Sequence, residues 1–379
     1  MPYRILTHCY YVRACGCRRS KTAILLMNLG GPRDADEVYP FLHRLFADPD
    51  IIPIPWQKRI APWIARRRTP KIIEQYNAIG GGSPIRAWTE RQGALLTELL
   101  DKQSPATAPH KVYLGFRYAA PLTEDALSTM LADGVTRAVA FTQYPQYSCS
   151  TTGSSLNELW RRVEEIDPKQ RIQWSLIDRW GNHPGLVKAF AHRIKEKLAT
   201  YSAEERDQVI ILFSAHSLPM SVVNRGDTYP GEVAATVNAV VAELAREGIN
   251  NAYRLVWQSQ VGPAAWLGPQ TSEAIDGLAK QGYKNQLLVP IAFTSDHIET
   301  LFELDHEYGE EAKEAGVTGY KRAESLNDSP LFIDAMADIV KEHLRATPSV
   351  SKQWMLRCPG CKSDTCSKTR TFFQRQSPQ

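Results

Sequence analysis

Short runs of apolar residues recur along this chain of 379 residues, and each is followed by turn residues and then by a helical pattern. The runs are apolar throughout rather than alternating, which is typical of strands that are buried on both faces of a sheet. Strands separated by helices favour parallel sheets built from βαβ units. The predicted strands are residues 22–28, 111–116, 137–142, 172–177, 208–214, 253–258, 285–293 and, more weakly, 319–325.

These eight runs divide into two sets of four near residues 180–200. We therefore predict an α/β fold with two similar doubly wound, Rossmann-like domains, each with a parallel four-stranded sheet. The N-terminal domain covers residues 21–183 and the C-terminal domain covers residues 184–347. Residues 348–379 lack the pattern and form a separate, cysteine-containing extension.

In doubly wound sheets, ligands bind beyond the carboxyl ends of the strands. The predicted strand ends carry aromatic, amide and ionisable residues, as in Arg117-Tyr118, residues 143–147 and residues 214–217. No GxGxxG or Walker loop follows any of these strands. The pattern therefore predicts a site for a flat or hydrophobic ligand rather than for a nucleotide.

An acidic stretch follows the seventh run. Asp296, Glu299, Glu303 and Glu307 are spaced three and four residues apart, so a helix would align them in one stripe with His297 at its first turn. Like charges at these spacings repel one another. Asp296 and Glu299 also fit a capping box at a helix start. That interpretation leaves Glu303 and Glu307 unexplained, and the alternative is a functional path for cations or protons.

Residues 51–73 contain no acid, six basic residues and four apolar residues at helical spacing, namely Trp56, Ile60, Trp63 and Ile64. A basic amphipathic stretch with tryptophans can lie in a membrane interface, and the alternative is a helix packed on its own domain. Pro53, Pro55 and Pro62 favour a lip or loop over a core helix. No apolar run reaches about 18 residues, so we predict no spanning helix.

The first twenty residues contain arginines and no acid. This pattern suits a mitochondrial presequence over residues 1–20, and a disordered start is the alternative. The formal net charge of +4 gives no sign of nucleic-acid binding.

Three of the seven cysteines, Cys358, Cys361 and Cys366, lie close together near the end of the chain. Closely spaced thiols of this kind usually bind metal. Cys149, just past a predicted strand, is the only cysteine in the folded body and would be the fourth ligand. Four thiolates suit either a structural zinc or a two-iron two-sulfur cluster, and spacing alone favours zinc slightly.

Taken together, four motifs resemble ferrochelatases over a region from about Lys21 to the end of the chain. They are SAHSLP (214–219), FTQYPQYS (141–148), GFRY (115–118) and FTSDHIET (293–300), and they occur in the order of the family. The cysteine tail resembles the animal-type enzymes, in which four cysteines hold a 2Fe-2S cluster. The resemblance therefore favours that cluster over zinc at Cys149, Cys358, Cys361 and Cys366.

The resemblance implies a chelatase-like fold and an enzyme that inserts ferrous iron into protoporphyrin IX. The product is protohaem, and the reaction is the terminal step of haem biosynthesis. It also implies a homodimer attached peripherally to the matrix side of the mitochondrial inner membrane.

By resemblance, His216 is the family's invariant histidine and Glu299 is its catalytic glutamate, with Asp296 and His297 beside it. Glu303 and Glu307 would continue the acidic path. Arg117 and Tyr118 match a pair in the substrate pocket, which we expect Tyr144, Ser150, Leu29 and Trp266 to line as well. Leu29 departs from the methionine of animal relatives, which conserves volume but removes a thioether.

Metallation replaces two pyrrole N–H protons with one dication. A histidine with a pKa near the operating pH is a natural acceptor for those protons, and ferrous iron accepts imidazole and carboxylate ligands. The competing interpretations are a chelatase for another tetrapyrrole or metal and a non-catalytic haem-binding or trafficking protein. A zinc hydrolase is disfavoured because HExxH is absent.

Overall fold

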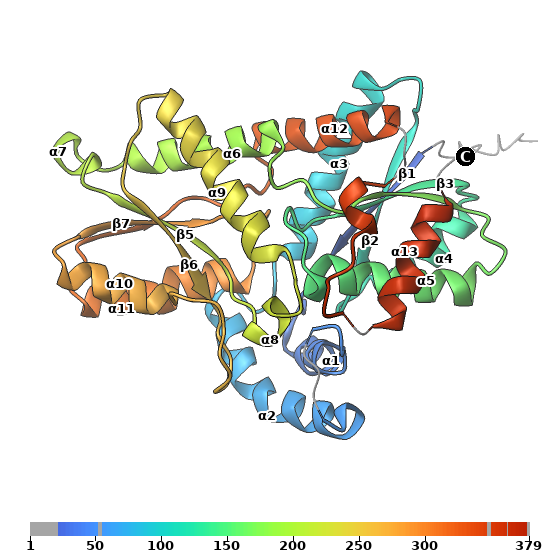
Figure 1. The fold of residues 1–379 in the computed structure, drawn as a ribbon, viewed down its shortest axis with the longest axis horizontal. Coiled ribbons are helices and arrows are strands. Elements are labelled where there is room, and N and C mark those ends of the chain that lie inside the picture. Colours follow the sequence, from blue (N-terminus) through green and yellow to red (C-terminus); the bar gives the residue numbers. More distant parts are fainter. Residues whose placement is uncertain (1–21, 52–54, 347–349, 362, 377–379) are drawn as a thin grey trace, which may run out of the picture.

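The computed structural model describes residues 22–51, 55–346, 350–361 and 363–376, so the expected presequence lies outside the described residues. Two parallel four-stranded sheets form the body, with the strand orders β2-β1-β3-β4 and β6-β5-β7-β8. The two orders are the same permutation, which confirms the predicted pair of similar domains (Figure 1). The strands are β1 (Thr22–Asn28), β2 (His110–Phe116), β3 (Arg137–Thr142), β4 (Gln173–Ile177), β5 (Ile210–His216), β6 (Tyr253–Gln258), β7 (Asn285–Pro290) and β8 (Gly319–Arg322).

Helices cover both faces of the two sheets, and further helices form the C-terminal extension. The first half contains α1 (Ala35–Phe46), α2 (Gln57–Ala78), α3 (Ile85–Gln103), α4 (Thr123–Ala132), the π-helix η1 (Cys149–Gly153) and α5 (Ser154–Ile166). The second half contains α6 (Pro184–Leu198), α7 (Ala203–Arg206), α8 (Met220–Val223), α9 (Tyr229–Arg246), α10 (Thr271–Lys280), the π-helix η2 (Glu299–Glu307), α11 (Tyr308–Glu314) and α12 (Pro330–Arg345). The extension contains the 3₁₀-helix η3 (Lys352–Met355) and α13 (Asp364–Arg375).

All eight predicted runs form strands, although three of them, β5, β7 and β8, end at residues other than those predicted. Strand β5 continues to His216, so the candidate histidine is the last residue of a strand. Strand β7 ends at Pro290, because the Phe293 amide donates to the Pro290 carbonyl and turns the chain. In β1, every residue from Thr22 to Asn28 is buried, as expected for a central strand covered on both faces.

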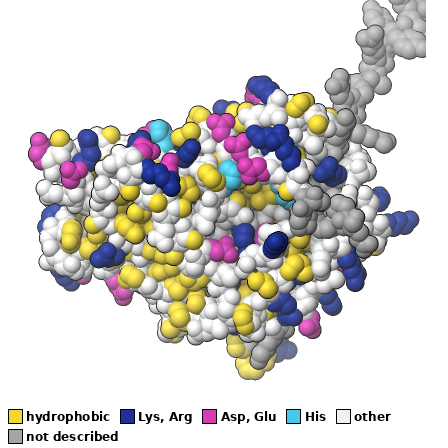
Figure 2. Space-filling view, turned by 45° about the horizontal axis from the view of Figure 1, so that its top comes forward, with side chains coloured by type: hydrophobic (Ala, Val, Ile, Leu, Met, Phe, Trp, Pro, Cys, Tyr) yellow, Lys and Arg dark blue, Asp and Glu magenta, His cyan; other side chains and the backbone are white. Residues whose placement is uncertain are grey.

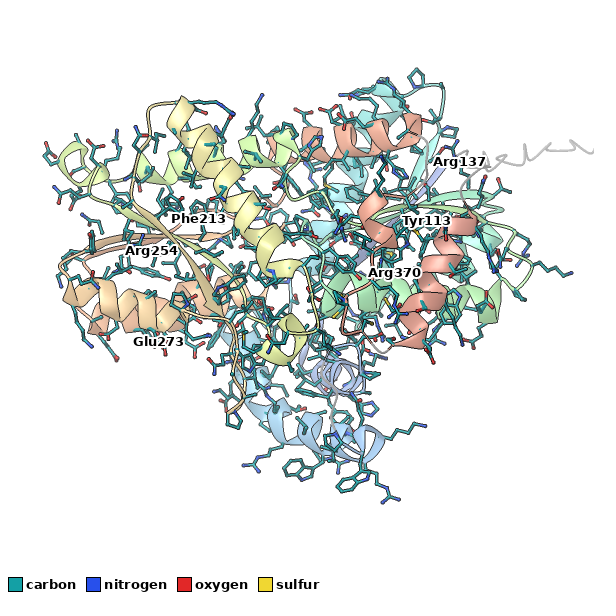
Figure 3. The ribbon with its side chains drawn as sticks, in the orientation of Figure 1. Tyr113, Arg137, Phe213, Arg254, Glu273 and Arg370 are labelled. Carbon is teal, nitrogen blue, oxygen red and sulfur yellow. The ribbon has the colours of Figure 1, made fainter. Side chains whose placement is uncertain are left out.

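One apolar core lies between the two sheets. It joins Ile24 and Phe141 of the first sheet to Phe213 of the second, together with side chains of α6, α9 and α12. Phe213 is labelled on β5 in Figure 3. Helix α12 also packs on α3 of the first half. The shared core fixes how the two sheets lie relative to each other.

The C-terminal extension packs on the first sheet beside α5 and β4. Trp354, Phe372 and Phe373 are buried in the same cluster as Trp174 of β4. Arg370 is also buried, on the side of α13 that faces the body (Figure 3). Each buried aromatic side chain contributes about 1.5–3 kcal/mol relative to full exposure, so apolar packing holds this segment in place.

Residues 57–78 form one continuous helix, α2, although Pro62 was expected to break this segment. Packing against α1 compensates for the missing proline N–H groups, because Ala61 and Ala65 are small enough to be buried against that helix. Trp56 and Trp63 are 82% and 60% exposed. Helix α2 therefore protrudes from the body with a buried face and an exposed apolar and basic face (Figures 1 and 2).

No helix in the described part of the chain is long and apolar enough to cross a membrane, which agrees with the sequence prediction.

Candidate active site

The loops after the equivalent strands β3 and β7 meet between the two sheets. The Thr294 hydroxyl donates to the Gln143 carbonyl at 3.4 Å, and the Gln146 side chain donates to the Ile291 carbonyl at 3.4 Å. Gln92 of α3 also donates to the Thr294 carbonyl at 3.2 Å. The ligand-binding ends of both sheets are therefore brought together.

His216 and Glu299, two of the predicted site residues, are in direct contact at this place. His216 Nδ1 lies 2.9 Å from Glu299 Oε2. Strand β5 positions the histidine at its carboxyl end, and η2 positions the glutamate at its first residue. The imidazole is 40% exposed and the carboxylate 19% exposed, so a ligand can reach the histidine.

The two groups change each other's proton affinity. Burial alone would lower the pKa of His216, but the negative charge of Glu299 raises it above its ordinary value. Burial alone would raise the pKa of Glu299. The neighbouring His216 and, to a smaller extent, His297 instead lower it to about 2. The carboxylate therefore stays ionised at neutral pH and makes the imidazole a stronger base.

His297 has a defined tautomer. Its Nδ1 lies 3.0 Å from the Ser295 carbonyl, which can only accept, so Nδ1 carries the proton. Its Nε2 lies 4.0 Å from Glu299 Oε1, beyond hydrogen-bond distance. The lone pair on Nε2 is thus directed toward the Glu299 carboxylate and is open to a proton or a metal ion.

The acidic stripe continues from Glu299 toward the surface. Glu303 accepts hydrogen bonds from Ser259 at 2.5 Å and from Tyr308 at 2.9 Å. Gln258 bridges the Glu299 carbonyl and the Glu303 carboxylate. Burial and the charge of Glu299 raise the pKa of Glu303, and Glu307, one turn further on, is exposed.

The helix of this stripe differs from the prediction in its start and its type. It begins at Glu299 and is a π-helix, a wide form that is frequent at functional sites. Asp296 and His297 precede it, so Asp296 is not part of the stripe. The alternative capping box is also wrong, because the residue that precedes the helix is Ile298, with no side-chain cap.

Asp296 instead anchors the loop before η2. Its carboxylate accepts hydrogen bonds from Ser325 at 2.6 Å and from Asn327 at 2.8 Å, and it pairs with Arg322 at 3.3 Å. Burial alone would raise its pKa, but the charge of Arg322 and the hydrogen bonds lower that pKa below its ordinary value. Its predicted catalytic role stays a prediction, and its contacts are those of a structural anchor.

Arg117 and Tyr118 lie in a buried polar network centred on Asp48. The Asp48 carboxylate is 3.0 Å from an Arg117 nitrogen and accepts from the Tyr118 hydroxyl at 2.6 Å. Ser154 Oγ also donates to it and accepts from Arg117 Nε at 3.0 Å. Tyr118 is only 1% exposed, so it supports the guanidinium rather than forming an open wall.

The roles of the remaining predicted substrate residues stay predictions. Burial raises the pKa of Tyr144, on which the charges of both Arg117 and Glu299 also act. Leu29 packs against the α1–α2 cluster that includes Tyr118. Ser150 Oγ and Trp266 Nε1 are buried atoms with no hydrogen-bond partner among the described residues.

The four cysteines of the predicted cluster are half-buried free thiols. Cys149 Sγ lies 4.0 Å from a guanidinium nitrogen of Arg225. The tail loop docks beside Cys149, because the Gly360 amide donates to the Arg225 carbonyl at 2.9 Å. Within the described residues, no group of three or more ligands is arranged to hold a metal ion.

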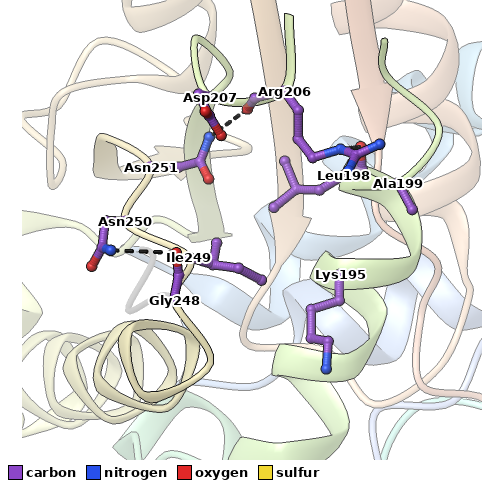
Figure 4. A pocket seen from close by; sticks show the side chains of 9 residues that line it. All are labelled: Lys195, Leu198, Ala199, Arg206, Asp207, Gly248, Ile249, Asn250 and Asn251. Atoms are coloured by element: carbon purple, nitrogen blue, oxygen red, sulfur yellow. Dashed lines mark hydrogen bonds between the residues drawn. The ribbon is translucent and has the colours of Figure 1, made fainter. Parts of the chain in front are cut away.

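Two cavities lie away from the His216–Glu299 pair. One, of about 420 Å³, is at the amino ends of β5 and β6 (Figure 4) and is lined by Lys195, Leu198, Ala199, Arg206, Asp207 and residues 248–251. The other, of about 1090 Å³, lies among β4, α9 and α12 and is lined by residues that include Arg179, Glu232 and His343. None of the predicted site residues lines either cavity.

Several residues of the site were not predicted. Asp48 follows α1, and Ser259 follows β6 with a backbone φ of +65°, which is rare for serine. Ser259 is recognisable in the sequence as a strand-end residue, like Gln258 before it, but the sequence alone assigns it no role. Asp48 carries no such signal, because it contacts Arg117 only through the tertiary fold.

The chain is similar to known ferrochelatases over almost its whole length. The family profile described as "Ferrochelatase" matches residues 21–344. A protein named "Ferrochelatase, mitochondrial" from Xenopus laevis is 58% identical over 96% of this chain and 88% of its own length. The human protein of that name is 57% identical over 95% of this chain and 84% of its own length.

A solved structure, "SirB from Bacillus subtilis with Fe3+", aligns with 85% of this chain and 94% of its own at 14% identity and a TM-score of 0.49. That similarity is too low to bear on function. The family profile and the two relatives, by contrast, cover the strands, the loops and the His216–Glu299 pair described above. The chain therefore belongs to the ferrochelatase family, the enzymes that insert ferrous iron into protoporphyrin to form haem.

Proposed function

We propose that His216 accepts the pyrrole protons of protoporphyrin IX while ferrous iron enters the ring, and that Glu299 strengthens this base. The contact between Nδ1 and Oε2 at 2.9 Å is the observation that carries the proposal. Glu299 holds Nδ1, so Nε2 is left to take the proton. An ionised carboxylate also stabilises the imidazolium that forms, which a non-catalytic haem-binding protein would not need.

The second part of the proposal is a path between the site and the surface. Exposed Glu307, half-buried Glu303 and Glu299 follow one another along η2. The raised pKa of Glu303 means that it binds and releases protons closer to neutral pH than Glu299 does. We assign the path to protons leaving or ferrous ions entering, with His297 Nε2 at its inner end.

We place the macrocycle between the His216–Glu299 pair and Arg117. The charges of both groups act on Tyr144, and we assign Leu29 and Trp266 to the apolar wall of this site. The free Ser150 hydroxyl and Trp266 indole N–H are available to polar groups of the substrate. The arrangement joins a basic group, an apolar wall and hydrogen-bond donors around one flat ligand.

The cysteines suit a 2Fe-2S cluster held by Cys149, Cys358, Cys361 and Cys366. The donor set fits in its chemistry, because the body and the tail supply four cysteine thiols, and the charges of Arg225 and Arg370 oppose the burial that raises the pKa of Cys149 and Cys366. A bound cluster would cross-link the extension to the body through iron–thiolate bonds and supply a one-electron redox centre. No step of the proposed proton transfer involves these residues.

We assign the chain to the mitochondrion, on the matrix side of the inner membrane, with residues 1–20 as the presequence. The relatives named above are mitochondrial proteins. The exposed face of α2 carries Trp56 and Trp63, and Arg67 lies 5.6 Å from the ring centre of Trp63. Exposed tryptophans beside arginines suit interfacial attachment to anionic lipid.

We also propose a homodimer. The extension exposes two neighbouring apolar side chains, Met355 and Leu356, the latter 65% exposed. A second copy of the chain is the partner that would cover them in the family's dimeric form. Sedimentation equilibrium measures this directly, and a monomer at micromolar concentration would refute the assignment.

The first prediction compares two variants in an anaerobic assay with protoporphyrin IX and ferrous iron. His216→Ala should lower kcat at least about a hundredfold, because general-base catalysis is lost, whereas porphyrin binding, measured by fluorescence quenching, should remain. Glu303→Gln should lower kcat less, since it changes the path and not the base. Turnover of His216→Ala within threefold of the original chain would contradict the assigned role.

The second prediction concerns the pH dependence of kcat/KM. The active form has neutral His216, so the rate rises as pH increases through the pKa of this residue. Glu299 raises that pKa, and therefore Glu299→Gln should shift the acid limb of the profile to lower pH while reducing the maximum. An acid limb that stays in place, or moves to higher pH, would show that Glu299 does not tune His216.

The third prediction concerns the thiols. Cys149→Ser should abolish the iron–sulfur absorbance of anaerobically purified protein and lower its melting temperature, while the extension remains docked through its buried aromatics. Cys17→Ser, in the assigned presequence, is the control and should keep the spectrum. One zinc per chain without acid-labile sulfide would refute the cluster and favour a structural zinc.

The fourth prediction concerns the membrane-facing helix. Trp56→Ser combined with Trp63→Ser should weaken co-sedimentation with anionic liposomes at least tenfold, because two large apolar side chains no longer enter the interface. Tyr283→Ser removes an aromatic residue that is 41% exposed in the second half and should bind as the original chain does. Equal binding of all three proteins would exclude α2 as the anchor.

A further inference from the structure

Asn157 on α5 is buried and hydrogen-bonded on both sides of its side chain. Its Nδ2 donates to Asp50 Oδ2 at 3.0 Å, and its Oδ1 lies 2.8 Å from the hydroxyl of Thr369 on α13. The carboxylate of Asp50 accepts and the amide nitrogen donates, so the amide oxygen faces Thr369, whose hydroxyl shares its hydrogen between this oxygen and the Thr365 carbonyl at 2.9 Å. Asn157 is 4% exposed and Thr369 is fully buried.

The bonds continue from Asp50 into the active site. The Asp50 amide donates to Asp48 Oδ1 at 2.9 Å. The other oxygen of Asp48 holds Arg117 at 3.0 Å and the Tyr118 hydroxyl at 2.6 Å. An unbroken series of contacts therefore runs from the C-terminal extension to the guanidinium at the proposed porphyrin site, in the order Thr369, Asn157, Asp50, Asp48 and Arg117.

We propose that Thr369 and Asn157 are positioning residues, through which the C-terminal extension fixes Arg117 for porphyrin binding. The effect on binding rests on the proposed role of Arg117. The extension then does more than cover the first sheet with aromatic residues. The hydroxyl of Thr369 is one end of a network that leads to Arg117 at the proposed porphyrin site.

The energetic cost of breaking this series of contacts between Thr369 and Arg117 supports the proposal. Without the Thr369 hydroxyl, the Asn157 amide oxygen is left buried without its donor, which is costly enough to favour movement of the side chain. The Asn157 amide also opposes the burial that raises the pKa of Asp50, so its displacement leaves a carboxylate that is poorly compensated. Asp50 and Asp48 then lose the arrangement that holds Arg117.

The test is Thr369→Val, which keeps the volume of the side chain and removes the donor. KM for protoporphyrin IX should rise about fivefold while kcat stays within twofold, a split that a merely structural role would not produce. Thr369→Ser restores the hydroxyl and should restore KM. Thr371→Val is the matched control, since Thr371 is exposed on the same helix and its hydroxyl bonds only to the Ser367 carbonyl at 3.0 Å.

Asp50→Asn keeps the proposal testable if Thr369→Val is insoluble, because it alters the network without touching the extension and should also raise KM. The double variant should be no worse than the larger single effect, because both changes break one series of bonds. Unchanged KM in Thr369→Val or in Asp50→Asn, or additive effects of the two, would overturn the proposal.

Arg117→Lys separates the two ways in which this proposal can fail. If Arg117→Lys raises KM and Thr369→Val does not, the link is wrong and the role of Arg117 stands. If neither variant raises KM, both the link and the role are overturned.

Discussion

The packing of two parallel sheets on one apolar core determines where every residue of the site lies. Parallel strands place all their carboxyl ends at one edge, and the shared core turns the two edges toward each other. His216 and Glu299 are separated by 83 residues yet touch. The loop contact between Thr294 and Gln143 depends on the same packing. A change that tilted one sheet on the other would therefore move the Arg117 guanidinium away from the His216–Glu299 pair.

The site also concentrates buried carboxylates, and each of them is compensated in a different way. Glu299 is neutralised by histidine, Asp296 by arginine and hydroxyl groups, and Asp48 by Arg117, Tyr118 and Ser154. Glu303 has only neutral donors besides the distant histidine, and its raised pKa is the result. Compensation of this kind separates carboxylates that must stay ionised from one that can exchange protons.

The sequence predicts most of the fold because central parallel strands are apolar on both faces, and all eight runs were recognisable for that reason. His216, Glu299 and His297 were predictable because functional residues cluster at the carboxyl ends of such strands and because their motifs resemble a known family. Asp48 and Asn157 were not, since their partners are chosen by tertiary packing. The proline-containing α2 was misjudged because small residues, rather than propensity, keep that helix continuous against α1. The type of the helix after Glu299 likewise has no signal in residue spacing.

The position of the extension has a consequence for biosynthesis. Trp354, Phe372 and Phe373 complete the hydrophobic cluster that covers Trp174 on the first sheet. The ribosome adds these residues only after the whole second half has been made. That face of the N-terminal half therefore lacks its aromatic cover while the second half is being synthesised, and it is closed only when α13 has emerged.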